Sequence, residues 1–184
     1  MHKTIETYRE IRGRAEADVA VARPAEKIRI LIGLGTCGIA AGARAVLAAL
    51  EQKLAQEGVE ADIVRVGCIG MCFNEPLVDI IKPGRPRISY GHVTPEMVSE
   101  LVDDYVLGDN PRPDLAVAVI GDEPFAGIPR WKDLPFFKYQ HRRVLRNCGV
   151  VDPEMIQDYV VRDGYRGLAK ALAEMRPEEI IQEV

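Results

Sequence analysis

A strand, a glycine-rich turn and a helix follow one another near the N-terminus, and this unit limits the folds open to the chain. Residues Ile28–Ile32 set arginine among β-branched and apolar side chains, which is typical of a strand. Gly33–Gly38 supplies the turn. From Ile39 to Gln56, apolar residues recur at spacings of three and four, which predicts an amphipathic helix that ends at Gly58. The unit therefore predicts the beginning of an α/β fold.

The segments that follow extend this unit to a small α/β sandwich. The pattern predicts another helix, which Thr94 caps and Gly108 ends, and three further strands, Val59–Val66, Leu77–Ile81 and Arg87–Tyr90. A stretch rich in proline and glycine joins the last two strands and is suited to a hairpin. There are too few strand–helix crossovers for a full nucleotide-binding sheet. The predicted fold class is α/β, a small mixed sheet with flanking helices.

Proline and glycine divide the chain into four predicted segments. Residues 1–24 form an N-terminal helical extension, and residues 25–108 form the α/β domain. Residues 109–134 are rich in Pro, Gly and Asp, which indicates a linker around one brief apolar run, Leu115–Ile120. Residues 135–184 are predicted to form short helices, for which Pro153 and Pro177 stand at first positions.

Composition excludes several classes of protein. The 184 residues carry a net charge of −4, whereas nucleic-acid surfaces usually have a basic excess. No apolar run approaches the roughly 20 residues that a membrane-spanning helix needs. The N-terminus shows no secretory signal, so we expect a cytoplasmic protein whose thiols stay reduced. Its four cysteines then indicate metal binding, redox chemistry or burial rather than disulfides.

Cys68 and Cys72 are separated by three residues at the end of a predicted strand, with Gly67 before them and Gly70 between them. The glycines let the backbone fold around an inorganic core, and amides in such a loop can bond cluster sulfurs. Iron–sulfur ligation is therefore one interpretation. Two packed cysteines in a loop and a structural zinc site are the alternatives, although no second pair or histidine couple lies nearby.

Cys37 stands where the glycine-rich turn enters the helix. A helix N-terminus favours a thiolate, which suits a cluster ligand or redox thiol, but a small buried residue is an equal alternative. The turn also matches G-x-G-x-x-G, a dinucleotide-binding pattern. That pattern requires a carboxylate at the end of the second strand, where this chain has Val66, so a dinucleotide site is disfavoured. Cys148 is expected to pack in a turn.

The C-terminal part of the chain resembles a known family. Its motifs are Pro135-Phe136-Phe137-Lys138, Arg146-Asn147-Cys148-Gly149, Asp152-Pro153-Glu154, Gly164-Tyr165 and Pro177-Glu178-Glu179. They resemble the segment that opens the flavin- and NADH-binding domain in the flavin-carrying NADH-dehydrogenase subunits of complex I, hydrogenases and formate dehydrogenases. Residues Lys27–Leu107 resemble the thioredoxin-like [2Fe–2S] ferredoxin domain that bacterial members often carry ahead of that segment.

The resemblance implies a cofactor, and the chain departs from the family pattern in two places. The family's first ligand pair, C-x-x-x-x-C, falls on Gly33 and Gly38, so the implied cluster ligands are Cys37, Cys68 and Cys72 with a non-cysteine fourth group. FMN, NAD and a [4Fe–4S] centre are expected only in a C-terminal part that this chain lacks. The full subunit would be an NADH dehydrogenase, and this piece alone should not oxidise NADH.

The sequence thus supports two functions. The first is electron transfer by a [2Fe–2S] domain inside a multi-subunit cytoplasmic oxidoreductase, with other subunits as partners and no nucleic acid or membrane span. The alternative is a cofactor-free docking domain that has lost its cluster.

Overall fold

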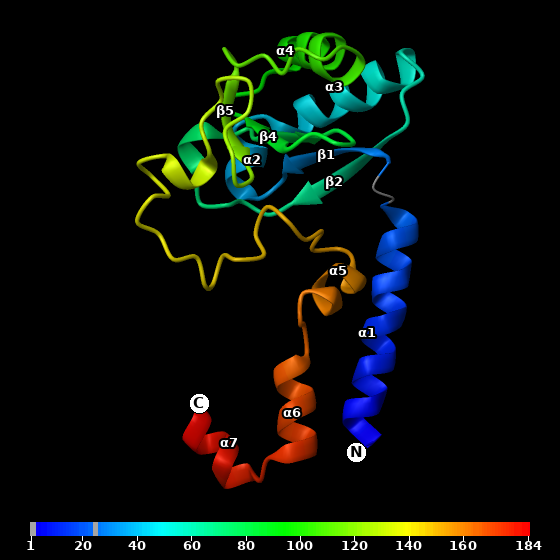
Figure 1. Cartoon of the computed structure of the whole chain (residues 1–184), viewed down its shortest axis with the longest axis vertical. Coiled ribbons are helices and arrows are strands. Elements are labelled where there is room, and N and C mark those ends of the chain that lie inside the picture. Colours follow the sequence, from blue (N-terminus) through cyan, green and yellow to red (C-terminus); the bar gives the residue numbers. More distant parts are fainter. Residues whose placement is uncertain (1–2, 24–25) are drawn as a thin grey trace. The chain divides into compact units, whose positions relative to one another are not determined.

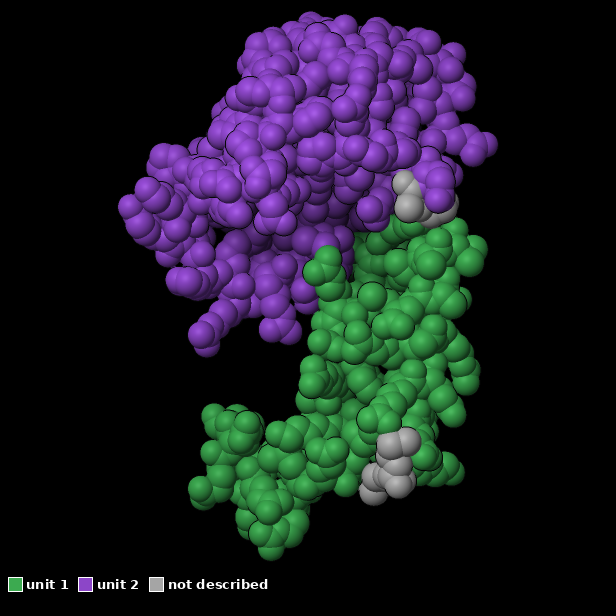
Figure 2. All heavy atoms as spheres, in the orientation of Figure 1, with its two compact units in different colours: residues 1–24, 152–184 green, residues 25–151 purple. Residues whose placement is uncertain are grey.

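The computed structural model describes residues 3–23 and 26–184. The chain divides into two compact units, which Figure 2 shows in different colours. The larger unit consists of residues 25–151, and the smaller unit combines residues 1–24 with residues 152–184. These two units are defined by contacts between residues in space, whereas the four segments were defined along the sequence. The division into four segments therefore stays a prediction.

The larger unit contains a five-stranded mixed sheet with the order β2-β1-β3-β4-β5 (Figure 1). Strand β1 (Ile28–Gly33), the second in this order, pairs in parallel with β2 (Ala61–Val66) and antiparallel with β3 (Val78–Ile81). The remaining strands, β4 (Arg87–Tyr90) and β5 (Ala116–Ile120), continue the sheet with antiparallel pairing. The predicted α/β class with a small mixed sheet is confirmed.

Helices α3 (Ala43–Gln56) and α4 (Pro95–Leu101) pack on each other and cover the sheet (Figure 1). The apolar stripe of α3 enters the main core through Ala43, Val46, Leu50 and Leu54. The predicted helix 39–56 is in fact two helices, because Gly42 takes a left-handed backbone (φ 103°) between α2 (Thr36–Ala40) and α3. Thr94 caps α4 as predicted and accepts from the amide of Met97.

The helix that begins at Pro95 changes its geometry before it ends. Residues Val102–Leu107 form a π-helical segment, η2, that continues directly from α4. The end at Gly108 agrees with the predicted end. Lys82, from the hairpin between β3 and β4, binds the carbonyls of Tyr105 and Gly108 there, at 2.8 Å and 2.5 Å.

Part of the predicted linker belongs to the sheet. Its apolar run forms β5 on the outer side of β4, and Ala118 and Val119 are completely buried. A bridge from Val119 to Arg130 and a short 3-10 helix, η3 (Trp131–Asp133), follow the strand. A run of five apolar residues is long enough for a strand of average length. Its pairing with the edge of β4 is a contact that only the structure reveals.

Two fully buried tyrosines provide a matched test of this packing. The Tyr90 hydroxyl donates to the carbonyl of Pro111 at 2.8 Å, whereas the Tyr105 hydroxyl has no partner among the described residues. We expect Tyr90→Phe to lower the free energy of unfolding by about 1–2 kcal/mol, because a buried carbonyl loses its donor. Tyr105→Phe should leave it unchanged or raise it. Urea denaturation of both variants measures the difference, and equal losses would contradict the assignment.

The smaller unit consists of helices, namely α1 (Lys3–Ala22), α5 (Ile156–Val161), α6 (Arg166–Glu174) and α7 (Pro177–Glu183). Arg23, directly after α1, forms a buried ion pair with Asp158 of α5 at 2.6 Å. The Tyr8 hydroxyl donates to the carbonyl of Gly164 at 3.1 Å. Asp152 accepts from the amide of Glu154, but α5 itself begins only at Ile156. In the described part of the chain, no helix is both long and apolar enough to cross a bilayer.

Candidate functional site

Three cysteine side chains from separate places in the sequence meet at one end of the sheet. Cys37 lies in the first turn of α2, Cys68 follows β2, and Cys72 begins the short 3-10 helix η1 (Cys72–Asn74). The Cys37 thiol donates to the Cys72 sulfur at 3.1 Å, and the sulfurs of Cys68 and Cys72 are 3.6 Å apart. All three sulfurs lie within 4.8 Å of one another. The structure therefore brings together all of the predicted site residues.

Glycines allow these segments to approach so closely. A Cβ atom at Gly35 would lie 3.0 Å from the amide nitrogen and 3.1 Å from the Cβ of Cys68. Gly70 takes a left-handed backbone (φ 94°), a conformation that glycine adopts without strain. In that conformation its amide donates to the Cys68 sulfur at 3.3 Å. The first turn of α2 and the loop after β2 can therefore bring their sulfurs to one place.

The three thiols differ in acidity because of burial and because of the hydrogen bonds that they share. Burial raises the pKa of the Cys68 thiol to about 12. Hydrogen bonds from Cys37 and Cys68 lower the pKa of Cys72, and the bond to Cys72 raises the pKa of Cys37. Metals and clusters bind thiolates, so loading this site would release the thiol protons.

A buried carboxylate that the sequence analysis did not single out lies next to the cysteines. Glu75 follows η1 and is 5% exposed. Its Oε2 accepts from the amide of Leu77 at 2.8 Å, and its Oε1 is buried with no hydrogen-bond partner among the described residues. Burial raises the pKa of Glu75, and the hydrogen bond from the Leu77 amide lowers it in part. The only signal in the sequence is a glutamate three residues after Cys72.

Gly33 and Gly38, which take the family's first two ligand positions in the resemblance, both pack against the site. A Cβ atom at Gly33 would lie 2.7 Å from Oε2 of Glu75. A Cβ atom at Gly38 would lie 2.1 Å from the carbonyl oxygen of Gly33 and 3.1 Å from Oε2 of Glu75. With this backbone and Glu75 in place, neither position has space for a side chain.

Cys148 stays outside the group of sulfurs. Its segment nevertheless covers the cysteine loop, because a Cβ atom at Gly70 would be 3.5 Å from Leu145 and one at Gly149 would be 2.2 Å from Ile69. Arg87 donates to the carbonyl of Gly149 at 2.6 Å and holds this cover to the sheet.

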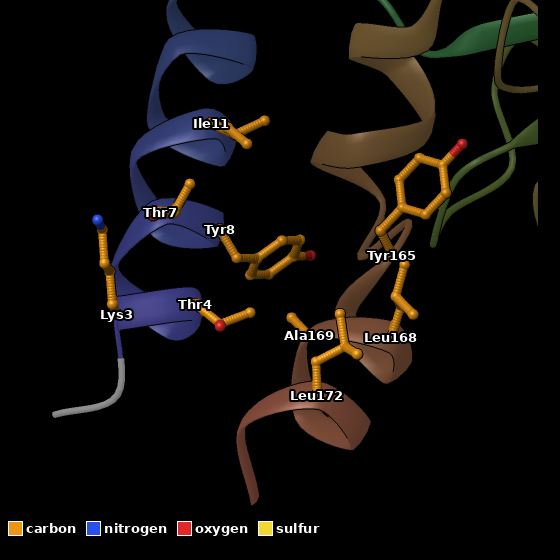
Figure 3. Close-up of a pocket in the computed structure, with 9 residues that line it drawn as sticks. All are labelled: Lys3, Thr4, Thr7, Tyr8, Ile11, Tyr165, Leu168, Ala169 and Leu172. Atoms are coloured by element: carbon orange, nitrogen blue, oxygen red, sulfur yellow. The ribbon is translucent and has the colours of Figure 1, made fainter.

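The smaller unit has an apolar groove of about 520 Å³ between α1 and α6. Figure 3 shows its lining, which includes Tyr8, Ile11, Tyr165, Leu168 and Leu172. Its described lining residues include neither a cysteine nor a carboxylate, so they offer no thiolate or carboxylate ligand for a metal. The three cysteines of the larger unit therefore form the candidate functional site.

Two proteins of Solidesulfovibrio fructosivorans are similar to this chain in sequence. NADP-reducing hydrogenase subunit HndB is 30% identical over 111 residues, which cover 59% of this chain and 87% of HndB. NADP-reducing hydrogenase subunit HndC is 52% identical over 44 residues, which cover 24% of this chain but only 9% of HndC. No protein-family model matches the chain.

Similar solved structures come from Aquifex aeolicus. The wild-type thioredoxin-like [2Fe–2S] ferredoxin at 1.5 Å resolution has a TM-score of 0.44 and 24% identity, and the match covers 50% of this chain and 98% of the ferredoxin. A second structure of a thioredoxin-like [2Fe–2S] ferredoxin has a TM-score of 0.46 and 24% identity, over 54% of this chain and 96% of the ferredoxin.

The sequence matches confirm the resemblance to hydrogenase-related subunits. The match to HndC is high in identity but short, so it says nothing about the rest of HndC. The match to HndB extends over most of that subunit. This chain therefore belongs to the family of the NADP-reducing hydrogenase subunit HndB.

Proposed function

We propose that this chain transfers electrons within a multi-subunit oxidoreductase and that Cys37, Cys68 and Cys72 hold a [2Fe–2S] cluster for this purpose. The observation that carries the proposal is the mutual approach of the three sulfurs within 4.8 Å. Its relatives HndB and HndC are named as subunits of an NADP-reducing hydrogenase, which supports other subunits as partners.

The residues around the sulfurs fit such a group. Thiolates are the usual ligands of iron–sulfur clusters, and amides that point at sulfur tune the reduction potential. Gly70 already directs its amide to the Cys68 sulfur, and the close approach of Gly35 keeps the two ligand-bearing segments together. A bound cluster would supply one-electron chemistry. The chain's own part is to ligate it, to donate hydrogen bonds and to shield one side from water.

Iron content and spectroscopy test the proposal directly. We expect the whole chain, purified without oxygen, to contain about two irons and two sulfides and to give an electron paramagnetic resonance (EPR) signal on reduction, as a [2Fe–2S] centre does. Zinc with no sulfide would instead indicate a structural metal site. Anaerobic protein that contains neither metal nor sulfide would overturn the proposal and favour the cofactor-free docking domain.

Two finer features belong to this proposal. We infer that the electrons come from or go to NADH or NADPH through a flavin-carrying subunit, on the basis of the segment that resembles the opening of the flavin- and NADH-binding domain. FMN, NAD and a [4Fe–4S] centre would then lie in such a partner or in a longer form of the chain. The cytoplasmic location stays a prediction.

A further inference from the structure

We propose that Glu75 supplies the fourth ligand of the cluster through its carboxylate, an inference that rests on the proposed function. A [2Fe–2S] centre takes four protein ligands, and ligands other than cysteine are tolerated on one of its irons, as in Rieske centres. The described residues bring only three sulfurs together. The geometry around Glu75 points to it as the missing ligand.

Burial of Glu75 is unexplained without a partner for its carboxylate. A buried polar atom with no hydrogen bond costs about 1–3 kcal/mol, and a buried charge costs more. Glu75 is only 5% exposed, its Oε2 has one donor and its Oε1 has none within the described chain. A bound iron would compensate for the burial of the charge, because it is positive, and it would give the unpartnered oxygen a metal to coordinate.

A second buried carboxylate, that of Asp79, is stabilised in the usual way by a cationic side chain. Asp79, on β3, is 8% exposed and forms an ion pair with Arg87. No lysine or arginine of the described residues forms an ion pair with Glu75. The sequence thus gives Asp79 a cation of its own and leaves Glu75 with none.

The carboxylate also lies at the right place. Its Oε2 occupies the space beside Gly33 and Gly38, at 2.7 Å and 3.1 Å from the Cβ positions of those residues, and Glu75 lines one cavity with Gly67 and Ile69, the two neighbours of Cys68. It therefore lies against the turn that leads to Cys37 and against the loop that carries Cys68. Glu75 is outside the group of sulfurs that are mutually within 4.8 Å, but ligands on two different irons need not all be that close.

The competing explanation is a buried water. Glu75 and Asp79 line one small cavity of about 10 Å³, and each has one unpartnered oxygen. A cavity of this size is at the lower limit for a single water. In that case Glu75 would be a structural residue, and its replacement would leave the electronic properties of the cluster unchanged.

Glu75→Gln in the whole chain separates these explanations, because it keeps the shape of the side chain and removes its charge. We expect at least a twofold loss of iron and sulfide per chain in anaerobically purified protein. We also expect shifted EPR g-values in whatever cluster remains. Asp79→Asn is the matched control, since it neutralises the other buried carboxylate on the same cavity, and it should retain the iron content and the EPR g-values of the wild type.

A second variant covers the case in which Glu75→Gln folds poorly. The three nearest neighbours of a Cβ atom at Gly33 all belong to Glu75, so Gly33→Cys combined with Glu75→Ala makes room for a thiolate in place of the carboxylate. We expect this double variant to recover cluster binding that Glu75→Ala alone loses.

Each outcome decides the inference. Wild-type iron content and g-values in Glu75→Gln would overturn it while leaving the proposed function standing. Equal losses in Glu75→Gln and Asp79→Asn would also overturn it, since they would mark a general effect of buried charge. A wild-type chain that contains no iron would overturn both the inference and the proposed function.

Discussion

Replacing Cys37 with serine is expected to reduce the iron and sulfide content of the anaerobically purified chain from about two of each to near zero. Cys37 carries one of the three sulfurs within 4.8 Å of one another, and among the described residues it is the only one of these cysteines on α2. A serine hydroxyl is far less acidic than a thiol and binds iron poorly at neutral pH. The loss of one thiolate from a site that has only three leaves too few ligands to hold two irons.

Cys148→Ser is the matched control for this experiment. Cys148 is also a free, half-buried cysteine of the larger unit, but its sulfur is not part of the three-sulfur group. Its replacement should therefore leave iron, sulfide and the EPR spectrum unchanged. If Cys37→Ser retains as much iron as Cys148→Ser, Cys37 is not a ligand and the site must be assigned to other groups.

The cysteine cluster could be predicted from the sequence because each ligand stands at the end of a regular element. Cys68 and Cys72 follow an apolar strand, and Cys37 lies in the first turn of the helix that follows another strand. Strands β1 and β2 pair in parallel, so the segments after them emerge at the same end of the sheet. The order of the strands and the glycines at the start of the helix are thus enough to predict that the sulfurs lie close together. The distances between the sulfurs can be obtained only from the structure.

Glu75 could not be predicted in the same way. Nothing in the spacing of the sequence shows that a glutamate beside a proline is buried, and most glutamates are exposed. Its position depends on the close approach of Gly33 and Gly38, which are far from it in sequence. Long-range contacts of this kind are absent from any local pattern.

Other differences between the predicted and the observed structure also arise from long-range contacts. β5 was predicted only as an apolar run in a linker, because its place at the edge of β4 is a tertiary contact. The buried pair of Arg23 and Asp158 joins positions 135 residues apart, so no periodicity could reveal it. Elements set by local chemistry were predicted well, such as the Thr94 cap with Pro95 at the first position of α4.

Gly38→Ala is expected to lower the free energy of unfolding by about 3 kcal/mol or more, because overpacking against a rigid backbone is strongly destabilising. The new Cβ atom would lie 2.1 Å from the carbonyl oxygen of Gly33. That oxygen belongs to β1, which is paired with a strand on each side, and it cannot move aside as a flexible side chain does. Alanine is better than glycine in a helix by only about 1 kcal/mol, so the clash outweighs this gain in α2.

Gly67→Ala provides the control, since a Cβ atom there meets nothing within 4 Å. Gly67 is also next to a site cysteine, so the two variants differ in packing rather than in distance from the site. The free energy of unfolding of Gly67→Ala should stay within about 0.5 kcal/mol of the wild-type value, as for other substitutions without a clash. Urea denaturation followed by circular dichroism measures both variants. Similar stabilities for the two would show that α2 shifts freely against β1, and then the turn that carries Cys37 could not hold its sulfur in a fixed place beside Cys72.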